Sequence, residues 1–224
     1  MMTPPLPRVA VLASGRGSNL AALLEARARG ELPVEFVLVG SDKADAGALR
    51  LAEAAGIPTL ALDPRNYPDR LTFDLHLFER IGASGAQWLV LAGYMRIIEG
   101  AALTPWVGRM INIHPSLLPK YRGLHTHRRA LQAGDKEHGA SVHFVTAELD
   151  GGPLIAQARI AIGPEDSEEH LAQRLLPLEH QLLPAVLNLL AGGRLQWQDE
   201  APQLDGQPLP APLLLGADGL QPTE

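Results

Sequence analysis

The sequence predicts an α/β fold, a doubly wound and mostly parallel sheet with an antiparallel C-terminal extension. Two observations predict it. From Arg8 to His114, short apolar runs alternate strictly with segments of helical spacing, which is the pattern of parallel strands joined by helices. After Leu131 the pattern changes to two longer strand-like stretches joined by the turn signal DGG at residues 150–152, which favours an antiparallel pair.

In the first half of the chain, each predicted strand is followed by a glycine-bounded or helical segment, as a parallel sheet requires. Residues 8–14 form a short β-branched run that ends at glycines, and residues 20–30 have helical spacing and stop at Gly30. The alternation then repeats, with a second helix that stops at Gly56 and strands that are almost wholly apolar. Strands are therefore expected at 8–14, 34–40, 57–62, 87–93 and 108–114, and helices at 20–30, 44–56 and within 67–85.

The second half predicts strands at 139–149 and 153–163 and one long amphipathic helix from Ser167 to Leu190, with kinks at Pro177 and Pro184. Residues 116–137 show neither helical nor strand spacing. They predict a long loop that is mobile without ligand and closes over substrate. A small hairpin is expected to turn at the Asp-Gly pair 205–206, and the chain is expected to fray beyond Pro210.

The composition narrows the class of protein. The chain has 224 residues, of which 46% are hydrophobic, enough for one large domain or two small ones. Its net charge of -6 argues against a broad nucleic-acid-binding surface. The absence of cysteine excludes disulfides, thiolate zinc sites and cysteine nucleophiles. No signal peptide and no apolar run of about 20 residues is visible, so a soluble, cytoplasmic protein is expected.

A glycine-rich turn, ASGRGSNL at residues 13–20, joins the first predicted strand to the first predicted helix. Glycines allow a ligand to approach the backbone, and free N–H groups at a helix N-terminus attract phosphate. The turn has neither the glycine spacing of a dinucleotide site nor the lysine of a P-loop, so it favours a monophosphate. The alternative is an ordinary tight turn in which Ser18 is the N-cap of the helix.

Asn112 and His114 place two polar side chains on one face of an otherwise apolar strand, at its carboxyl end. Ligands of open parallel sheets bind at such ends. Asparagine can donate to an oxyanion, histidine can also move a proton, and Asp150 on its glycine-rich turn could orient the imidazole. The alternatives are a turn-forming asparagine, a surface histidine and a plain hairpin turn. His125 and His127 lack a third ligand at suitable spacing, so no metal site is expected there.

Several segments together resemble one enzyme family. They are ASGRGSNL, LAGYMRII, NIHPSLLPKYRGLHTHRRAL, HGASVHFVTAELDGGPLIAQ and the pair Glu179-His180. In this order, from about Arg8 to Leu209, the sequence is similar to the phosphoribosylglycinamide formyltransferases, folate-dependent enzymes of purine synthesis. HPSLLP and DGGP are shared with the wider family that uses 10-formyltetrahydrofolate, whereas GRGSNL and GLHTHRRAL are more discriminating.

The resemblance implies a Rossmann-like formyltransferase fold and transfer of the formyl group of 10-formyltetrahydrofolate to the amine of glycinamide ribonucleotide. It implies that Asn112 and protonated His114 stabilise the oxyanion and that Asp150 keeps His114 charged. It assigns to the ribonucleotide Gly17, Ser18, Asn19 and Glu179. It assigns to the folate Arg70, Met95, Arg96, Ile97, Ile98, Asn112, Ala147, Glu148, Leu149 and Asp150. The folate is a co-substrate, and no metal or nicotinamide is implied.

One domain is expected over residues 1–209, with a phosphate-binding half at about 8–110 and a folate-binding and catalytic half at about 111–209. The composition predicts a poorly ordered tail at 210–224. A monomer or homodimer without nucleic acid or membrane is expected. Two alternative functions remain. One is a hydrolase that releases formate from the same folate with the same three residues, and the other is a non-enzymatic folate-binding module.

The sequence departs from the family in places. Leu176 stands where some relatives have a basic or amide residue, which removes a polar contact from the late helix. Arg16 and Arg122 replace smaller or different residues, and each is expected either to bring positive charge to the site or to be solvated. The bond between Leu118 and Pro119 matches a position that is cis in the family.

Overall fold

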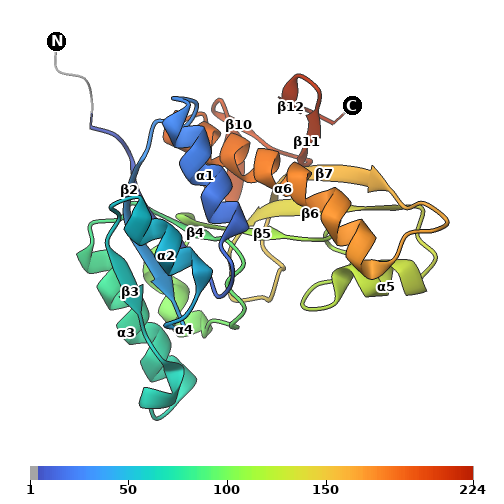
Figure 1. Cartoon of the computed structure of the whole chain (residues 1–224). Helices are drawn as coiled ribbons and strands as arrows, with labels where there is room; N and C mark the ends of the chain where they lie inside the picture. The colour runs from blue at the N-terminus through green and yellow to red at the C-terminus, as the bar shows by residue number, and fades with distance from the viewer. Residues whose placement is uncertain (1–4, 224) are drawn as a thin grey trace. The chain divides into compact units, whose positions relative to one another are not determined.

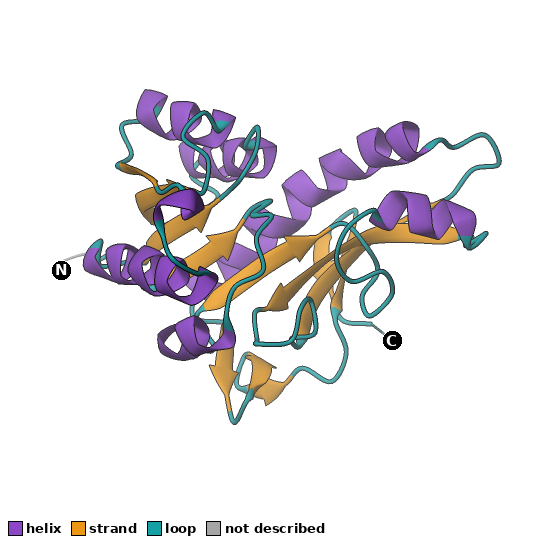
Figure 2. Cartoon of the chain, turned by 90° about the horizontal axis from the view of Figure 1, so that it is seen from below, coloured by secondary structure: helices purple, strands orange, loops and turns teal. Residues whose placement is uncertain are grey.

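The computed structural model describes residues 5–223 and divides into two compact units (Figure 1). The first unit runs up to Ile111 and the second begins at Asn112. The boundary falls inside strand β5, Met110–His114. Each unit has its own strands and helices, and Figure 2 shows the helices, strands and loops of the chain. Among the described residues, no helix has the length and apolar character needed to cross a lipid bilayer.

The strands of the first unit are parallel and lie in the order β4-β1-β2-β3. Valine, leucine and alanine dominate them, and β1 is buried from Val9 to Leu12. Such continuous apolar runs suit parallel strands covered on both faces. The strands are β1 Arg8–Leu12, β2 Glu35–Ser41, β3 Thr59–Ala61 and β4 Trp88–Leu91.

The helices of the first unit connect these strands, and α1 and α2 lie side by side (Figure 1). Asp69 caps α3 by accepting the amide hydrogen of Thr72, and the helix buries Phe73, Leu77 and Ile81. The α-helices are α1 Ser18–Ala28, α2 Gly47–Ala54, α3 Arg70–Ala83 and the short α4 Gly100–Leu103. Two 3₁₀ turns, η1 Pro64–Asn66 and η2 Thr104–Trp106, complete the unit.

The second unit adds the antiparallel strands. β6, Glu137–Phe144, and β7, Leu154–Ala161, form an antiparallel pair, and β11, Leu213–Gly216, runs parallel to β7. β12, Gly219–Gln221, closes the edge against β11. A separate small sheet contains β8 Leu195–Gln198, β9 Ala201–Leu204 and β10 Gln207–Pro208. Parallel strands in the first unit and antiparallel pairs in the second confirm the predicted fold class, and the hairpin expected at residues 205–206 joins β9 to β10.

Helix α6, Glu168–Ala191, contacts β6 and β7 (Figure 2). Ser167 caps it by accepting the amide hydrogen of His170, and leucines from Leu171 to Leu190 form its buried face. The helix continues through Pro177 and Pro184. The helix was predicted at nearly these bounds because its apolar spacing is regular over more than twenty residues.

Two expectations were wrong. Residues 116–137 contain a short helix, α5, Thr126–Gln132, which begins after His125 in the left-handed region and buries Thr126 and Ala130. Seven residues are too few for helical spacing to stand out. The tail beyond Pro210 is also ordered, since Leu213 is 2% exposed and pairs with Ala156 of β7. The fraying was expected from composition alone, and the pairing with a distant strand has no local signal.

Candidate active site

Asn112 and His114 on strand β5 both contact the carboxylate of Asp150. The amide nitrogen of Asn112 lies 3.4 Å from one oxygen of Asp150, and Nδ1 of His114 lies 3.4 Å from the other. His114 is buried and Asp150 nearly so. Asp150 lies on the turn between β6 and β7, which is closed by a hydrogen bond from the amide of Gly151 to the carbonyl of Glu148. The three residues that sequence reasoning grouped therefore lie together in the second unit.

His114 stands between two hydrogen-bond acceptors. Its Nε2 donates to the carbonyl of Tyr121 at 2.9 Å, and its Nδ1 faces Asp150. Only the charged imidazolium carries a hydrogen on both nitrogens, so the contacts suit the charged ring. Burial works against that charge and lowers the pKa of His114 below its ordinary value, and the attraction of Asp150 offsets this only in part. Asp150 thus favours the charged ring, as expected, but burial, which the expectation left out, opposes it in the free protein.

Asp150 is held from several sides. Its Oδ2 accepts the amide hydrogen of Gly123 at 2.8 Å, and its Oδ1 lies 3.7 Å from Nε2 of His143. Burial pushes its pKa up, but the charge of His114 and the amide hydrogen of Gly123 are among the influences that outweigh this and bring the pKa below the ordinary value. Asp150 itself has a φ of 47°, a conformation that aspartate and asparagine tolerate.

His143 is a site residue that sequence reasoning missed. It is 2% exposed, and its Nε2 lies 3.1 Å from the amide nitrogen of Asn112. A signal was present, since Ser141 and His143 place two polar side chains on one face of an apolar strand. The carbonyl of Tyr121 and the amide of Gly123 were also missed, because backbone groups leave no mark in the sequence.

A buried polar network fixes the segment that follows β5. The hydroxyl of Ser141 accepts the amide hydrogen of Leu118 and donates to the carbonyl of Ser116. The side-chain amide of Gln157 donates to the carbonyl of Leu118 at 3.0 Å. The bond between Leu118 and Pro119 is cis, as the resemblance implied. β6 and β7 thus hold the segment that ends at the Tyr121 carbonyl beside His114.

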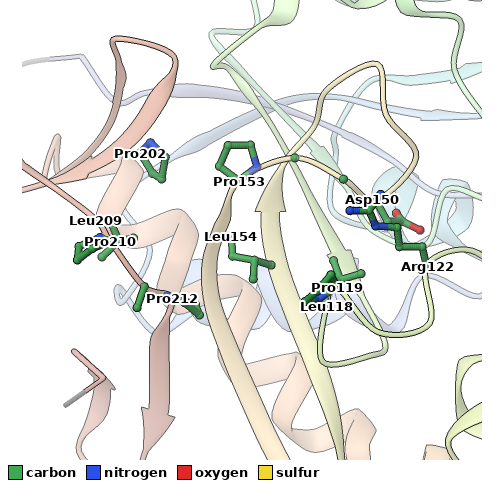
Figure 3. Close-up of a pocket in the computed structure, with 13 residues that line it drawn as sticks. Leu118, Pro119, Arg122, Asp150, Pro153, Leu154, Pro202, Leu209, Pro210 and Pro212 are labelled. Carbon is green, nitrogen blue, oxygen red and sulfur yellow. The ribbon is translucent and has the colours of Figure 1, made fainter.

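A cavity of about 400 Å³ adjoins Asp150 within the second unit. Figure 3 shows Asp150 and Arg122 on one side and residues of the C-terminal segment on the other, with Pro153 and Leu154 between them. Arg122 forms an ion pair with Glu148, so its charge is already matched by a carboxylate. Of the residues expected to line the pterin pocket, Ala147, Glu148 and Leu149 are exposed.

The first unit holds the predicted phosphate loop. Gly17, with a φ of 85°, is the N-cap of α1, and Ser18 is the first helical residue, so the alternative that made Ser18 the cap was wrong. A side chain at Gly17 would approach the Cα of Ala48 within 2.8 Å, which only glycine avoids. Asn19 is buried in the first turn of α1, while Arg16 is exposed.

The predicted folate segment in the first unit is anchored at both ends. The hydroxyl of Ser14 accepts the amide hydrogen of Met95, and the carboxylate of Asp74 accepts that of Glu99. Arg96 packs over the ring of Phe73. Between the anchors, Met95 and Ile97 are 65% and 50% exposed, which leaves apolar side chains and backbone open to a ligand.

Three further positions considered in the sequence lie on helices. Arg70 begins α3 and pairs with Glu99, whose oxygen lies 3.3 Å away. Glu179 and Leu176 lie on α6, both partly buried. Within residues 5–223, no cluster of three or more histidine, cysteine or acidic residues is arranged to hold a metal ion.

The known proteins that this chain is similar to are formyltransferases. The family model for formyl transferases matches residues 7–187. The phosphoribosylglycinamide formyltransferase of Escherichia coli K12 is 46% identical over 202 residues, which cover 90% of this chain and 95% of that protein. The solved structure of the phosphoribosylglycinamide formyltransferase of Coxiella burnetii is 48% identical, with a TM-score of 0.87 over 92% of this chain and 96% of that one. The glycinamide ribonucleotide transformylase 1 of Symbiobacterium toebii is 42% identical, with a TM-score of 0.86 over 90% and 95%.

Proposed function

Because this chain belongs to the formyl transferase family, we propose that it transfers the formyl group of 10-formyltetrahydrofolate to the amine of N1-(5-phospho-D-ribosyl)glycinamide, in de novo purine (IMP) biosynthesis. The observation that carries the chemistry is the shared carboxylate: Asp150 contacts both Asn112 and His114 at 3.4 Å. An amide donor and an imidazole can stabilise the oxyanion of acyl transfer, and a carboxylate in contact with both can orient them.

In the proposed mechanism the substrate amine attacks the formyl carbon and a tetrahedral intermediate forms, with negative charge on the former carbonyl oxygen. Asn112 and His114 donate hydrogen bonds to that oxygen. The C–N10 bond then breaks, the amine gives up a proton, and N10 of the folate gains one. His114 is suited to move that proton, since its pKa is low in the free protein and rises as negative charge develops beside it.

The contacts of His114 set one requirement for this step. Both of its ring nitrogens already have partners, the Tyr121 carbonyl and Asp150. A hydrogen bond to the oxyanion therefore replaces the bond to Tyr121, because the bond to Asp150 supports the charge that the ring gains. We infer that substrate binding moves the Tyr121 carbonyl, in line with the expected closure of residues 116–137.

For the ribonucleotide, we propose contacts from the start of α1 and from α6. The N-terminus of an 11-residue helix, after a glycine, attracts a phosphate through its amide groups and its dipole. Gly17, Ser18 and Asn19 would hold that phosphate, and the Glu179 carboxylate would accept hydrogen bonds from the ribose hydroxyls. The net charge of -6 makes such local groups necessary for an anionic substrate.

For the folate, we propose that Arg70 attracts its glutamate carboxylates and that the exposed segment from Met95 to Ile98 contacts it through backbone and apolar groups. Asn112 and residues 147–150 would line the pterin pocket. Support comes from the exposure of Met95 and Ile97 and from the two anchors that hold this segment. Arg70 would exchange its present partner Glu99 for the ligand.

The same proposal covers the domain organisation, the oligomeric state and the partners of the protein. We propose one formyltransferase domain made of two halves, in a cytoplasmic monomer or homodimer that binds neither nucleic acid nor membrane. The acidic net charge supports the exclusion of nucleic acid.

One assay tests the function. Consumption of 10-formyltetrahydrofolate is followed with and without the ribonucleotide. We expect consumption only when the ribonucleotide is present, with formylated ribonucleotide produced in equal amount. Equal release of formate in its absence would contradict the proposal and favour the hydrolase. An Asn112→Ala, His114→Ala double variant is the background control, because it retains neither proposed oxyanion donor.

A further inference from the structure

His143 lies next to Asn112, and each of its two ring nitrogens contacts a polar group. Its Nδ1 is 2.8 Å from the carbonyl of Phe144, and its Nε2 is 3.1 Å from the amide nitrogen of Asn112. An oxygen of Asp150 lies 3.7 Å from the same Nε2, which is beyond hydrogen-bond distance, so Phe144 and Asn112 are the two hydrogen-bond partners. The side chain is 2% exposed, so water does not compete for these contacts. The two partners together decide where the ring carries its hydrogen.

A carbonyl oxygen can only accept, so the hydrogen of a neutral ring lies on Nδ1 and points to Phe144. Nε2 then carries a lone pair and must accept. The group opposite it, the NH₂ of Asn112, is a donor. Donor and acceptor are therefore matched in a single arrangement: Phe144 fixes the tautomer of His143, and His143 binds one hydrogen of Asn112.

The second hydrogen of the Asn112 amide is only weakly engaged, since its nearest acceptor, the Asp150 carboxylate, lies 3.4 Å away. A flipped amide would turn the oxygen of Asn112 toward a lone pair of His143 and toward the negative charge of Asp150. Both contacts would be repulsive. The surroundings thus dictate which end of the amide points inward, and leave one N–H beside Asp150.

We propose that His143 is a positioning residue, which binds one N–H of Asn112 and so holds the other N–H ready for the oxyanion. The proposal deepens the proposed function, because it explains how a single amide keeps the orientation that the reaction needs. His143 touches neither substrate in this scheme and acts only through Asn112.

The tautomer is tested first, by a long-range ¹H–¹⁵N NMR spectrum of the unliganded protein with ¹⁵N-labelled histidine at about pH 8. We expect hydrogen on Nδ1 of His143 and none on Nε2, and the signal is assigned by its loss in His143→Gln. Hydrogen on Nε2 would overturn the proposal, because Nε2 could then not accept from Asn112. This measurement does not depend on catalysis, so its outcome stands even if the proposed function fails.

Kinetics then test the consequence. In His143→Gln the side-chain oxygen can replace the Nε2 lone pair, whereas His143→Leu offers no acceptor. We expect kcat to fall about 10- to 100-fold in the Leu variant, as for a misplaced catalytic group, with both KM values little changed. The Gln variant should recover most of the loss. Equal losses in the two variants, or a change confined to KM, would contradict the proposal.

A double-mutant cycle separates this role from a purely structural one. If His143 acts through Asn112, then His143→Leu should cost nothing further in an Asn112→Ala background. An unchanged fold-loss in that background would assign the effect to Asp150 or to the fold. Thermal unfolding of each variant shows whether it is folded. If His143→Leu does not fold, His143→Ala, which also offers no acceptor, replaces it in the cycle, and the NMR result decides the hydrogen-bond arrangement.

Discussion

At the scale of single residues, Asp150 connects most of the site. Asn112, His114 and the amide of Gly123 all meet its two oxygens. Asn112 and His114 could be predicted from their spacing at a strand end, and Asp150 from its turn, because these are local patterns. The pKa of His114 could not, since its direction depends on burial, which the whole fold determines.

Replacement of Asp150 by asparagine tests its electrostatic role. Asp150→Asn keeps the size of the side chain and tolerates the positive φ, but removes the charge. Because Asp150 raises the pKa of His114 against burial, the substitution should lower that pKa further, and kcat should fall about 100-fold or more. NMR titration of His114 and steady-state kinetics provide the measurements. Near-normal kcat with an unshifted titration would reduce Asp150 to a turn residue.

The phosphate loop gives a second prediction at this scale. Asn19→Ala should raise the KM for the ribonucleotide about 10-fold through the loss of one or two hydrogen bonds, and leave the KM for the folate nearly unchanged. Arg16→Ala is the matched control, since Arg16 is exposed on the same loop, and it reveals whether this arginine contributes charge. If the KM for the ribonucleotide were unchanged in Asn19→Ala, the loop would be a plain turn between β1 and α1.

At the scale of elements, the longest helix was predicted and the short helix α5 was not. The long helix α6 repeats its apolar spacing over 24 residues, whereas α5 has only seven. α5 also carries one partner of a histidine pair, in which Nδ1 of His127 lies 2.9 Å from Nε2 of His138 on β6. Two imidazoles in contact share one hydrogen easily but not two positive charges, so the pair favours neutral rings.

This pair predicts a loss of stability in mild acid. Burial, together with the neighbouring His127, lowers the pKa of His138 to about 4, and burial also lowers those of His127 and His114. The unfolded chain therefore binds protons below about pH 6.5 that the folded protein does not. The free energy of unfolding should be constant above that pH and fall as the pH drops from 6.5 toward 4.

The expected loss from His138 alone is about 1.6 kcal/mol between pH 6.5 and pH 5, since the slope approaches about 1.4 kcal/mol per unit of pH below the unfolded pKa. Urea unfolding at several pH values measures it. His138→Gln is the control, because it can still accept or donate a hydrogen bond but does not titrate. An equally steep pH dependence in that variant would assign the acid sensitivity to other groups.

At the scale of the whole molecule, the α/β class followed from the alternation of strands and helices, because each strand-helix repeat is encoded locally. The last two strands, β11 and β12, were not predicted, since β11 gains its place from pairing with β7, more than fifty residues earlier in the chain. The same tail supplies Pro210 and Pro212 to the cavity that adjoins Asp150. A segment expected to be a frayed end is thus part of the second unit.

The last prediction tests whether this tail is structural. Leu213→Ala removes a side chain that is 2% exposed and should destabilise the protein by about 2–5 kcal/mol, as for other buried leucines. Leu220→Ala is the control on β12, where the residue is only partly buried, and should cost less than about 1.5 kcal/mol. Urea unfolding measures both. A chain that ends at Leu209 should lose more stability than Leu213→Ala, because it also loses the backbone pairing of β11 with β7. Equal stability of the full and shortened chains would show that the tail contributes nothing to the fold, as its composition suggests.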